Sequence, residues 1–307
     1  MDRKIKSALT LSLLSPFFGE VMSGSTPPLE IINPFSFLFL WAFYGGGVLL
    51  VRELWVRWGR GYLRLMLLGL SYGIIEEGLA VKSFFDPQWA DLGVLATYGR
   101  VFGVNLVWAV WLSIFHAIFS ISVPILLIDI FYSELKEMPL LGKKGLKITL
   151  VAFISALLIT FFLLNRYPPP PVQYSIAFLI TVLLVLKTKT LRTAPPKLMS
   201  AFTLKHPMSY GTLFTLSLFI LYMFIPNTSV PFVIPVTLGP LFTVHLYSQM
   251  EKLPALGRFA LVIGILSPFL LFYDMILELN NIFGMSAVGV GTFIVLLWKY
   301  RRMKSLS

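Results

Sequence analysis

Two adjacent carboxylates and a histidine stand out because they interrupt apolar segments that are long enough to cross a bilayer. Glu76 and Glu77 lie in the segment 63–82, and His116 lies in the segment 104–131. A charge near the bilayer centre costs roughly 3 kcal/mol or more, so ionisable groups at this depth usually mark function. Paired carboxylates beside a histidine suit general acid–base chemistry, in which a carboxylate activates water. We therefore expect these three residues to form the catalytic centre.

Five further residues are candidates for accessory roles, because they share the depth or helix face of these three or flank them: Glu20, Asn105, Ser113, Lys82 and Arg100. A helix rise of about 1.5 Å per residue places Glu20 near the level of the carboxylates. Asn105 and Ser113 share one face with His116, which indicates a polar cavity between helices. Lys82 and Arg100 are expected near the outer surface, either as ligands and counter-ions of the site or as interfacial anchors.

Small residues accompany the candidate site along the helix that carries it. Gly69, Gly73 and Glu77 repeat every four residues, which places them on one helix face suited to close helix packing. Elsewhere, Leu14-Ser-Pro-Phe17 recurs as Leu266-Ser-Pro-Phe269. Four matching residues are too few to indicate an internal duplication.

The composition is that of a multi-pass, all-α membrane protein. Of 307 residues, 57% are hydrophobic and only 13% are charged, too few to cover the surface of a soluble domain of this size. The basic residues are spread over short loops, so the net charge of +11 does not indicate nucleic-acid binding. The absence of cysteine excludes disulfides and thiolate chemistry, and we expect neither a metal nor another cofactor.

Hydrophobic segments predict about ten transmembrane helices in one continuous membrane domain. A basic loop containing Pro195 and Pro196 divides the domain into a half at 1–186, which carries the site, and a half at 187–307. The expected spans cover residues 7–23, 35–51, 63–82, 104–131, 147–164, 173–187, 208–226, 231–249, 258–278 and 282–298.

The distribution of basic residues predicts the orientation. With ten spans, all but three of the 25 Lys and Arg residues fall on one side, and Lys82, Arg100 and Arg166 fall on the other. Because basic loops stay in the cytoplasm, both termini are expected to be cytoplasmic, in the cell membrane. The longest polar outer loops, at 23–34 and 83–103, then lie over the carboxylates. We therefore expect the site to open outward and function to reside in the first four helices.

The order of the site residues resembles the CAAX-protease and bacteriocin-processing family of intramembrane peptidases. That family carries Glu-Glu-x-x-x-Arg on one helix and Phe-x-x-x-His on the next, followed later by His-x-x-x-Asn. Here Glu76 and Glu77 begin the first motif and His116 ends the second. The resemblance covers about 50 residues. It implies an intramembrane hydrolase in which one glutamate activates water, His116 assists, and a membrane-embedded peptide is the substrate.

This chain departs from the family pattern at three positions. Val81 stands at the arginine position, with Lys82 one residue later, and Leu112 stands at the phenylalanine position. The third motif would be His245-x-x-x-Gln249, which the resemblance would assign to the oxyanion site. These departures put the stabilisation of the carboxylates and of an oxyanion in doubt.

Two other classes of function fit the same residues. Carboxylates and a histidine at mid-membrane are also what a proton-coupled transporter or permease of a small solute needs. A scaffold that binds a lipid, or that assists assembly, could use the polar cavity for a headgroup. The distinguishing observation is spatial. Clustering around a water-sized void favours hydrolysis, and a polar path to both faces favours transport.

Overall fold

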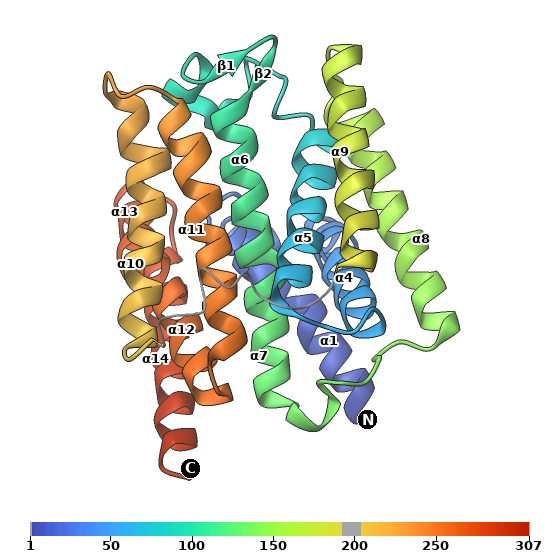
Figure 1. The fold of residues 1–307 in the computed structure, drawn as a ribbon, viewed down its shortest axis with the longest axis vertical. Helices are drawn as coiled ribbons and strands as arrows, with labels where there is room; N and C mark the ends of the chain where they lie inside the picture. Colours follow the sequence, from blue (N-terminus) through green and yellow to red (C-terminus); the bar gives the residue numbers. More distant parts are fainter. Residues whose placement is uncertain (1, 192–203, 307) are drawn as a thin grey trace.

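The computed structural model describes residues 2–191 and 204–306, and their secondary structure is almost entirely helical. The α-helices of the first half are α1 (Arg3–Pro16), α2 (Pro28–Ile31), α3 (Pro34–Leu40), α4 (Gly46–Arg57), α5 (Tyr62–Gly73), α6 (Leu106–Phe115), α7 (Val123–Phe131), α8 (Lys143–Ile159) and α9 (Pro171–Thr190). Those of the second half are α10 (Pro207–Phe219), α11 (Val233–Lys252), α12 (Ala255–Pro268), α13 (Asp274–Leu279) and α14 (Met285–Lys304). The long helices run side by side as one bundle (Figure 1).

Short segments of other geometry join these helices. In the part of the chain that the structure describes, seven are π-helical: η1 (Phe17–Val21), η2 (Trp41–Gly45), η3 (Ile74–Ala80), η5 (His116–Ser122), η7 (Thr160–Leu164), η9 (Ile220–Phe224) and η11 (Phe269–Tyr273). Three are 3₁₀-helical: η4 (Ala90–Ala96), η6 (Ser133–Leu135) and η10 (Ile225–Asn227). The two strands, β1 (Arg100–Val101) and β2 (Val104–Asn105), form a small antiparallel hairpin. The π-helical segments continue α-helices, so several long helices change their winding part-way along, whereas α9, α11 and α14 do not.

Within residues 2–191 and 204–306, six helices are long and apolar enough to cross a membrane. They span Pro34–Arg57, Leu106–Phe131, Lys143–Leu164, Pro171–Thr190, Pro207–Asn227 and Ala255–Leu279. The other four predicted ranges are also helical, in α1–η1, α5–η3, α11 and α14, but these helices do not meet the same criterion of length and apolarity. The multi-pass helical character is confirmed, and the number of ten crossings stays a prediction.

Loops predicted for the same side of the membrane lie together. Both termini are at the lower end of the bundle, and the β1–β2 hairpin is at the upper end (Figure 1). At the lower end, Arg3 pairs with Glu134 at 2.7 Å. At the upper end, the Tyr98 hydroxyl donates to the Val230 carbonyl at 2.9 Å. The first and the last helix therefore have their terminal ends on the same side of the bundle. The predicted boundary with Pro195 and Pro196 lies outside the described residues.

A proline precedes two of the π-helical segments. Pro16 ends α1 and Pro268 ends α12, and η1 and η11 follow directly. Proline has no backbone N–H, so one helical hydrogen bond is missing at each position and the winding can change there. The recurring Leu-Ser-Pro-Phe sequence therefore marks a shared local geometry.

Among the six apolar spans of the described residues, α6–η5–α7 is the most buried: 89% of an 18-residue apolar stretch of it is buried, compared with 11% for α9. Helix α5 packs closely on it, as the small-residue stripe predicts. A Cβ added at Gly69 would lie 2.8 Å from the Ala117 Cα, and one added at Gly73 would lie 2.9 Å from the Ser113 Cα. Only glycine allows the two backbones to approach this closely. This contact sets the carboxylates of η3 against the histidine of η5.

Candidate functional site

His116 lies between the two adjacent glutamates. Its Nε2 atom is 3.4 Å from Glu77 Oε1, and its Nδ1 atom is 3.2 Å from Glu76 Oε2. The side chains of His116 and Glu76 are only 4% and 1% exposed, and that of Glu77 is 13% exposed. One ligand atom from each residue can be chosen so that all lie within 4.8 Å of one another, which would allow them to hold a metal ion. The structure thus brings together the three residues predicted to form the centre.

Hydrogen bonds from nearby serines, one of them supported by Trp108 of α6, hold the Glu77–His116 pair in place. The Ser83 hydroxyl donates to Glu77 Oε2 at 2.5 Å, and the Trp108 indole N–H donates to Ser83 Oγ at 3.0 Å. On the other side, His116 Nδ1 and Ser120 Oγ form a hydrogen bond at 3.0 Å. Glu77 Oε1 and His116 Nε2 are thereby oriented toward each other.

Glu20 joins the site from the first helix, as its depth predicts. Its carboxylate accepts hydrogen bonds from the Tyr44 hydroxyl at 2.5 Å and from the Thr26 hydroxyl at 2.8 Å. The Tyr44 ring also lies beside His116, with 6.0 Å between the ring centroids. Tyr72 also borders the imidazole, with 6.2 Å between the ring centroids, and its ring centroid lies 6.3 Å from that of Tyr44. The two tyrosines therefore lie together on one side of His116.

Four of the predicted ionisable residues lie in π-helical segments: Glu20 in η1, Glu76 and Glu77 in η3, and His116 in η5. Tyr44 lies in η2. A π-helical turn displaces side chains from the regular α-helical faces and often occurs at functional sites. Here the wider turns allow consecutive residues, Glu76 and Glu77, to contact the same imidazole.

The site lies at the floor of a cavity of about 580 Å³. Glu20, Glu77 and His116 line it, and outer-loop residues such as Ser25 and Asp91 form its mouth. Six of the seven π-helical segments in the described residues supply lining side chains, all except η7. The inner half of the α6–η5–α7 span is tightly packed, since Phe119, Ile121 and Ile125 are 0% exposed. Residues of the predicted outer loops therefore border the opening of the cavity.

The cavity is acidic and aromatic. Its lining contains Glu20, Glu77 and Asp91 but neither lysine nor arginine. Loss of hydration, and secondly the charge of Glu77, raise the pKa of Asp91. Aromatic side chains cover much of the remaining wall: Tyr44, Trp89, Trp108, Trp111, Phe115, Tyr222, Phe269 and Tyr273. Such a lining favours neutral or cationic ligands over anions.

The predicted counter-ions Lys82 and Arg100 are directed elsewhere. Lys82 is 2% exposed, and its ammonium donates to the carbonyls of Phe161 and Asn165. Arg100 donates to the carbonyls of Ala96 and Phe85 in the outer loop. Both side chains stabilise the backbone next to the cavity, so the carboxylates gain no basic partner from them.

The remaining predicted residues lie outside the Glu–His cluster. Asn105 caps α6, because its Oδ1 atom accepts from the Trp108 N–H and its amide donates to the Leu95 carbonyl. Ser113 lies on the other side of α6, where it lines a second cavity. His245 packs edge-on against Tyr210 of α10, with 5.7 Å between the centroids, and does not line the acidic cavity.

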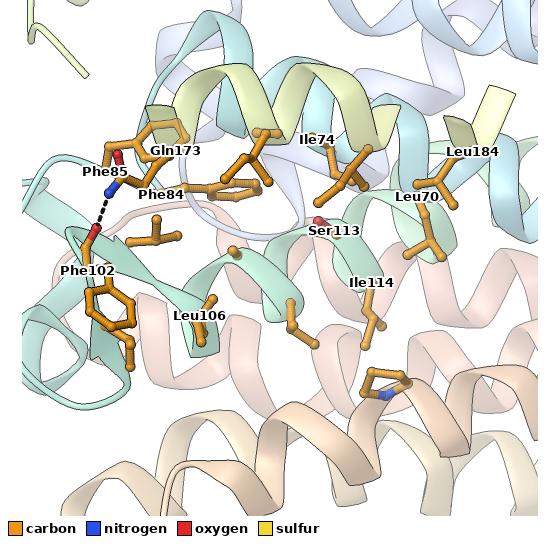
Figure 2. A pocket seen from close by; sticks show the side chains of 18 of the residues that line it. Leu70, Ile74, Phe84, Phe85, Phe102, Leu106, Ser113, Ile114, Gln173 and Leu184 are labelled. Atoms are coloured by element: carbon orange, nitrogen blue, oxygen red, sulfur yellow. Dashed lines mark hydrogen bonds between the residues drawn. The ribbon is translucent and has the colours of Figure 1, made fainter. Parts of the chain in front are cut away.

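That second cavity has a volume of about 630 Å³ and an apolar wall (Figure 2). It is a groove between α5, α6, α9 and α11, and Leu70, Ile74 and Leu184 are among its lining residues. At one end the Gln173 amide donates to the Phe102 carbonyl at 2.8 Å. Helix α6 separates this groove from the Glu–His cluster.

A comparison with protein families now adds to this geometry. The model of an uncharacterized membrane protein family matches residues 9–225, more than half of the chain. The chain belongs to this membrane protein family. The match supports a protein of the lipid bilayer with several apolar helices, and gives no support to the resemblance to the CAAX-protease and bacteriocin-processing family. No curated protein and no solved structure matches the chain.

The part of the chain that matches the membrane protein family contains the whole cluster. Residues 9–225 include Glu20, Glu76, Glu77 and His116, together with Tyr44 and Ser83, and end before His245. Sequence analysis had not identified Tyr44, Tyr72 or Ser83. Ser120 lies four residues after His116, on the polar helix face that the sequence predicts for Asn105, Ser113 and His116. Tyr44 had no such signal, since only the fold brings the second predicted span against the first.

Proposed function

We propose that the chain is a membrane-embedded hydrolase that activates water at the Glu76–Glu77–His116 cluster. The observation that carries this proposal is the approach of Glu77 and His116, at 3.4 Å, on the floor of a polar cavity. A carboxylate and an imidazole at this separation can pass a proton directly between them, so the pair can take a proton from a water on its cavity-facing side, as general acid–base catalysis requires.

The surroundings of the pair support a role in proton transfer. Trp108 and Ser83 hold one oxygen of Glu77 and leave the other facing His116. Glu20 adds a third carboxylate at the same cavity. Pre-oriented groups in a site that excludes most water need little reorganisation during reaction.

The cavity indicates the kind of substrate. Its volume of about 580 Å³ suits a side chain or a short segment, and its acidic, aromatic wall favours a neutral or cationic group. Together with the outward orientation that we infer from the basic loops, this supports cleavage of a peptide or lipid bond presented at the outer surface of the cell membrane. The tightly packed half below His116 argues against a polar path through the protein, and so against the transporter alternative.

The test is hydrolysis by the purified full-length protein in lipid nanodiscs, offered mixtures of membrane peptides and lipid esters in ¹⁸O-labelled water. Products identified by mass spectrometry should carry one ¹⁸O atom at the cleaved bond. Glu77→Gln and His116→Ala should each lower the rate by about 10²–10⁴-fold, the usual contribution of a general acid or base.

Asp274→Asn is the matched control, because Asp274 is also a fully buried carboxylate but lies outside the cavity lining. Its hydrolysis rate should equal that of the wild type. Labelled product formed equally well by Glu77→Gln would remove the proposed role of the cluster. Solute-dependent proton uptake into proteoliposomes without any hydrolysis would favour transport instead.

A further inference from the structure

We propose that Glu76, Glu77 and His116 bind a divalent transition-metal ion of the Zn²⁺ type, although the cysteine-free sequence had suggested a metal-free site. The first support is geometric. Ligand atoms of the three residues lie within 4.8 Å of one another, and His116 Nε2 lies 3.4 Å from Glu77 Oε1. Two ligands of one tetrahedral ion at about 2.1 Å lie roughly 3.4 Å apart, so this pair already has the required separation. Glu76 contacts the other ring nitrogen, at 3.2 Å, and its carboxylate would have to turn toward Nε2 to complete the site.

The second support is an unused ligand atom. Glu76 is 1% exposed, and its Oε2 atom forms no hydrogen bond in the described structure, although it lies 3.2 Å from His116 Nδ1. That nitrogen is paired with Ser120 Oγ instead. A buried carboxylate oxygen without a partner is costly, and a bound cation would remove that cost.

The third support is charge. Glu20, Glu76 and Glu77 lie together, and in the described residues the ion pairs of these carboxylates involve only His116. Lys82 and Arg100 donate to backbone carbonyls instead. One divalent ion would neutralise two of the three carboxylates, which apolar surroundings otherwise disfavour as charged groups.

The neighbours of the three residues resemble the outer shell of a metal centre. A ligating histidine usually forms a hydrogen bond through its second ring nitrogen, and a ligating carboxylate is held through its second oxygen. Ser120 provides the first contact and Ser83 the second. Only three side chains converge, and Glu77 and His116 face the cavity, so a coordination position is left for water or substrate as in catalytic zinc sites.

The donor set selects among metals. Two carboxylate oxygens and one imidazole nitrogen suit Zn²⁺ and neighbouring first-row ions, whereas Mg²⁺ and Ca²⁺ prefer six or more oxygen ligands. A bound ion would polarise the attacking water of the proposed hydrolase. The metal site goes beyond that function, because an ion can bind here whether or not the protein hydrolyses anything.

The test is direct metal binding by the full-length protein in nanodiscs after removal of metals with a chelator. Zinc added back and dialysed should remain at one ion per chain by elemental analysis, and Mg²⁺ should not. Co²⁺ in place of zinc should give the visible absorption of a four- or five-coordinate site. Zinc should also raise the melting temperature of the wild type, since a ligand of the folded state stabilises it.

Glu76→Gln, Glu77→Gln and His116→Ala should each weaken zinc binding by more than 100-fold and remove the zinc-dependent rise in melting temperature. Ser83→Ala, which alters only the support of Glu77, should weaken binding by about 10–100-fold. His245→Ala is the matched histidine control and should bind zinc as the wild type does, because His245 lies against Tyr210.

Wild-type protein that retains no stoichiometric zinc and gives no Co²⁺ absorption would overturn the proposal, as would full retention of zinc by His116→Ala. Both wild-type measurements are independent of whether any variant folds. Zinc binding without hydrolysis would support the metal site and contradict the proposed hydrolase function. Hydrolysis by a protein that binds no zinc would support the hydrolase function and contradict the metal site.

Discussion

A buried lysine near buried carboxylates usually neutralises them, but Lys82 does not. It adopts a left-handed backbone conformation, with φ of 65°, directly after the π-helical segment that carries the glutamates. This turn directs its ammonium to the carbonyls of Phe161 and Asn165 at the end of η7, 4.3 Å from the Phe161 ring centroid. A basic side chain at a helix C-terminus satisfies carbonyls that the helix leaves unpaired. Lys82 therefore stabilises the backbone next to the cavity and leaves the negative charge of the glutamates without a basic partner.

Lys82→Met should therefore affect stability and spare the chemistry. Loss of the ammonium leaves two buried carbonyls without donors, which should lower the free energy of unfolding by about 1–3 kcal/mol. The measurement is denaturant unfolding of the purified protein, with Lys147→Met, an exposed lysine of α8, as control. Zinc affinity and hydrolysis should equal those of the wild type. A specific loss of either one, with stability unchanged, would return Lys82 to the role of a site residue.

At the scale of the helices, the site depends on the close contact of α5 with α6 and η5. Glycines at positions 69 and 73 let the two backbones meet, and the π-helical turns then aim side chains from both helices into one cavity. The consequence is that the relative position of Glu77 and His116 is set by backbone packing. A side chain added at this contact should therefore disturb the site without altering any of its polar residues.

Gly73→Ala tests this dependence. The added Cβ would lie 2.9 Å from the Ser113 Cα and 3.1 Å from its carbonyl oxygen, so the helices must separate. Overpacking of this kind typically costs 1–3 kcal/mol, measured here by denaturant unfolding, and zinc affinity should fall as well. Gly291→Ala is the matched control, since no atom lies within 4 Å of its added Cβ. Equal effects of both substitutions would show that the contact does not position the site.

Sequence could predict the parts of this arrangement that follow from depth and periodicity. The level of Glu20, the Gly69–Gly73 face and the pairing of Glu77 with His116 all follow from helix rise and helix period. The π-helical turns could not be predicted, because they depend on how each helix packs. Tyr44 was missed for the same reason, and Lys82 was assigned by its proximity in sequence while a left-handed turn directs it away.

At the scale of the whole molecule, both halves build the cavity. The ionisable residues come from the first four predicted spans, as expected, but Tyr222 of η9 and Phe269 and Tyr273 of η11 form part of the wall. The second half therefore adds aromatic side chains to the cavity wall. Its helices are placed by contacts of α11 with α5 and α6, and of α12 with α7. Residues from both halves of the chain are therefore needed to form the side walls of the cavity.

The orientation of the molecule decides which compartment the cavity serves. The sequence contains no cysteine, so single cysteines report topology without background labelling. Ser25→Cys lies at the cavity mouth, and Ser305→Cys lies at the exposed C-terminus at the other end of the bundle. In sealed right-side-out vesicles, an impermeant maleimide should label Ser25→Cys directly and Ser305→Cys only after permeabilisation, because the basic loops stay inside. Labelling of both from one side would imply an even number of crossings between the two positions, whereas the ten predicted spans place nine there. If Ser305→Cys were labelled directly and Ser25→Cys only after permeabilisation, the fold would be unchanged but the cavity, and any hydrolysis in it, would face the cytoplasm.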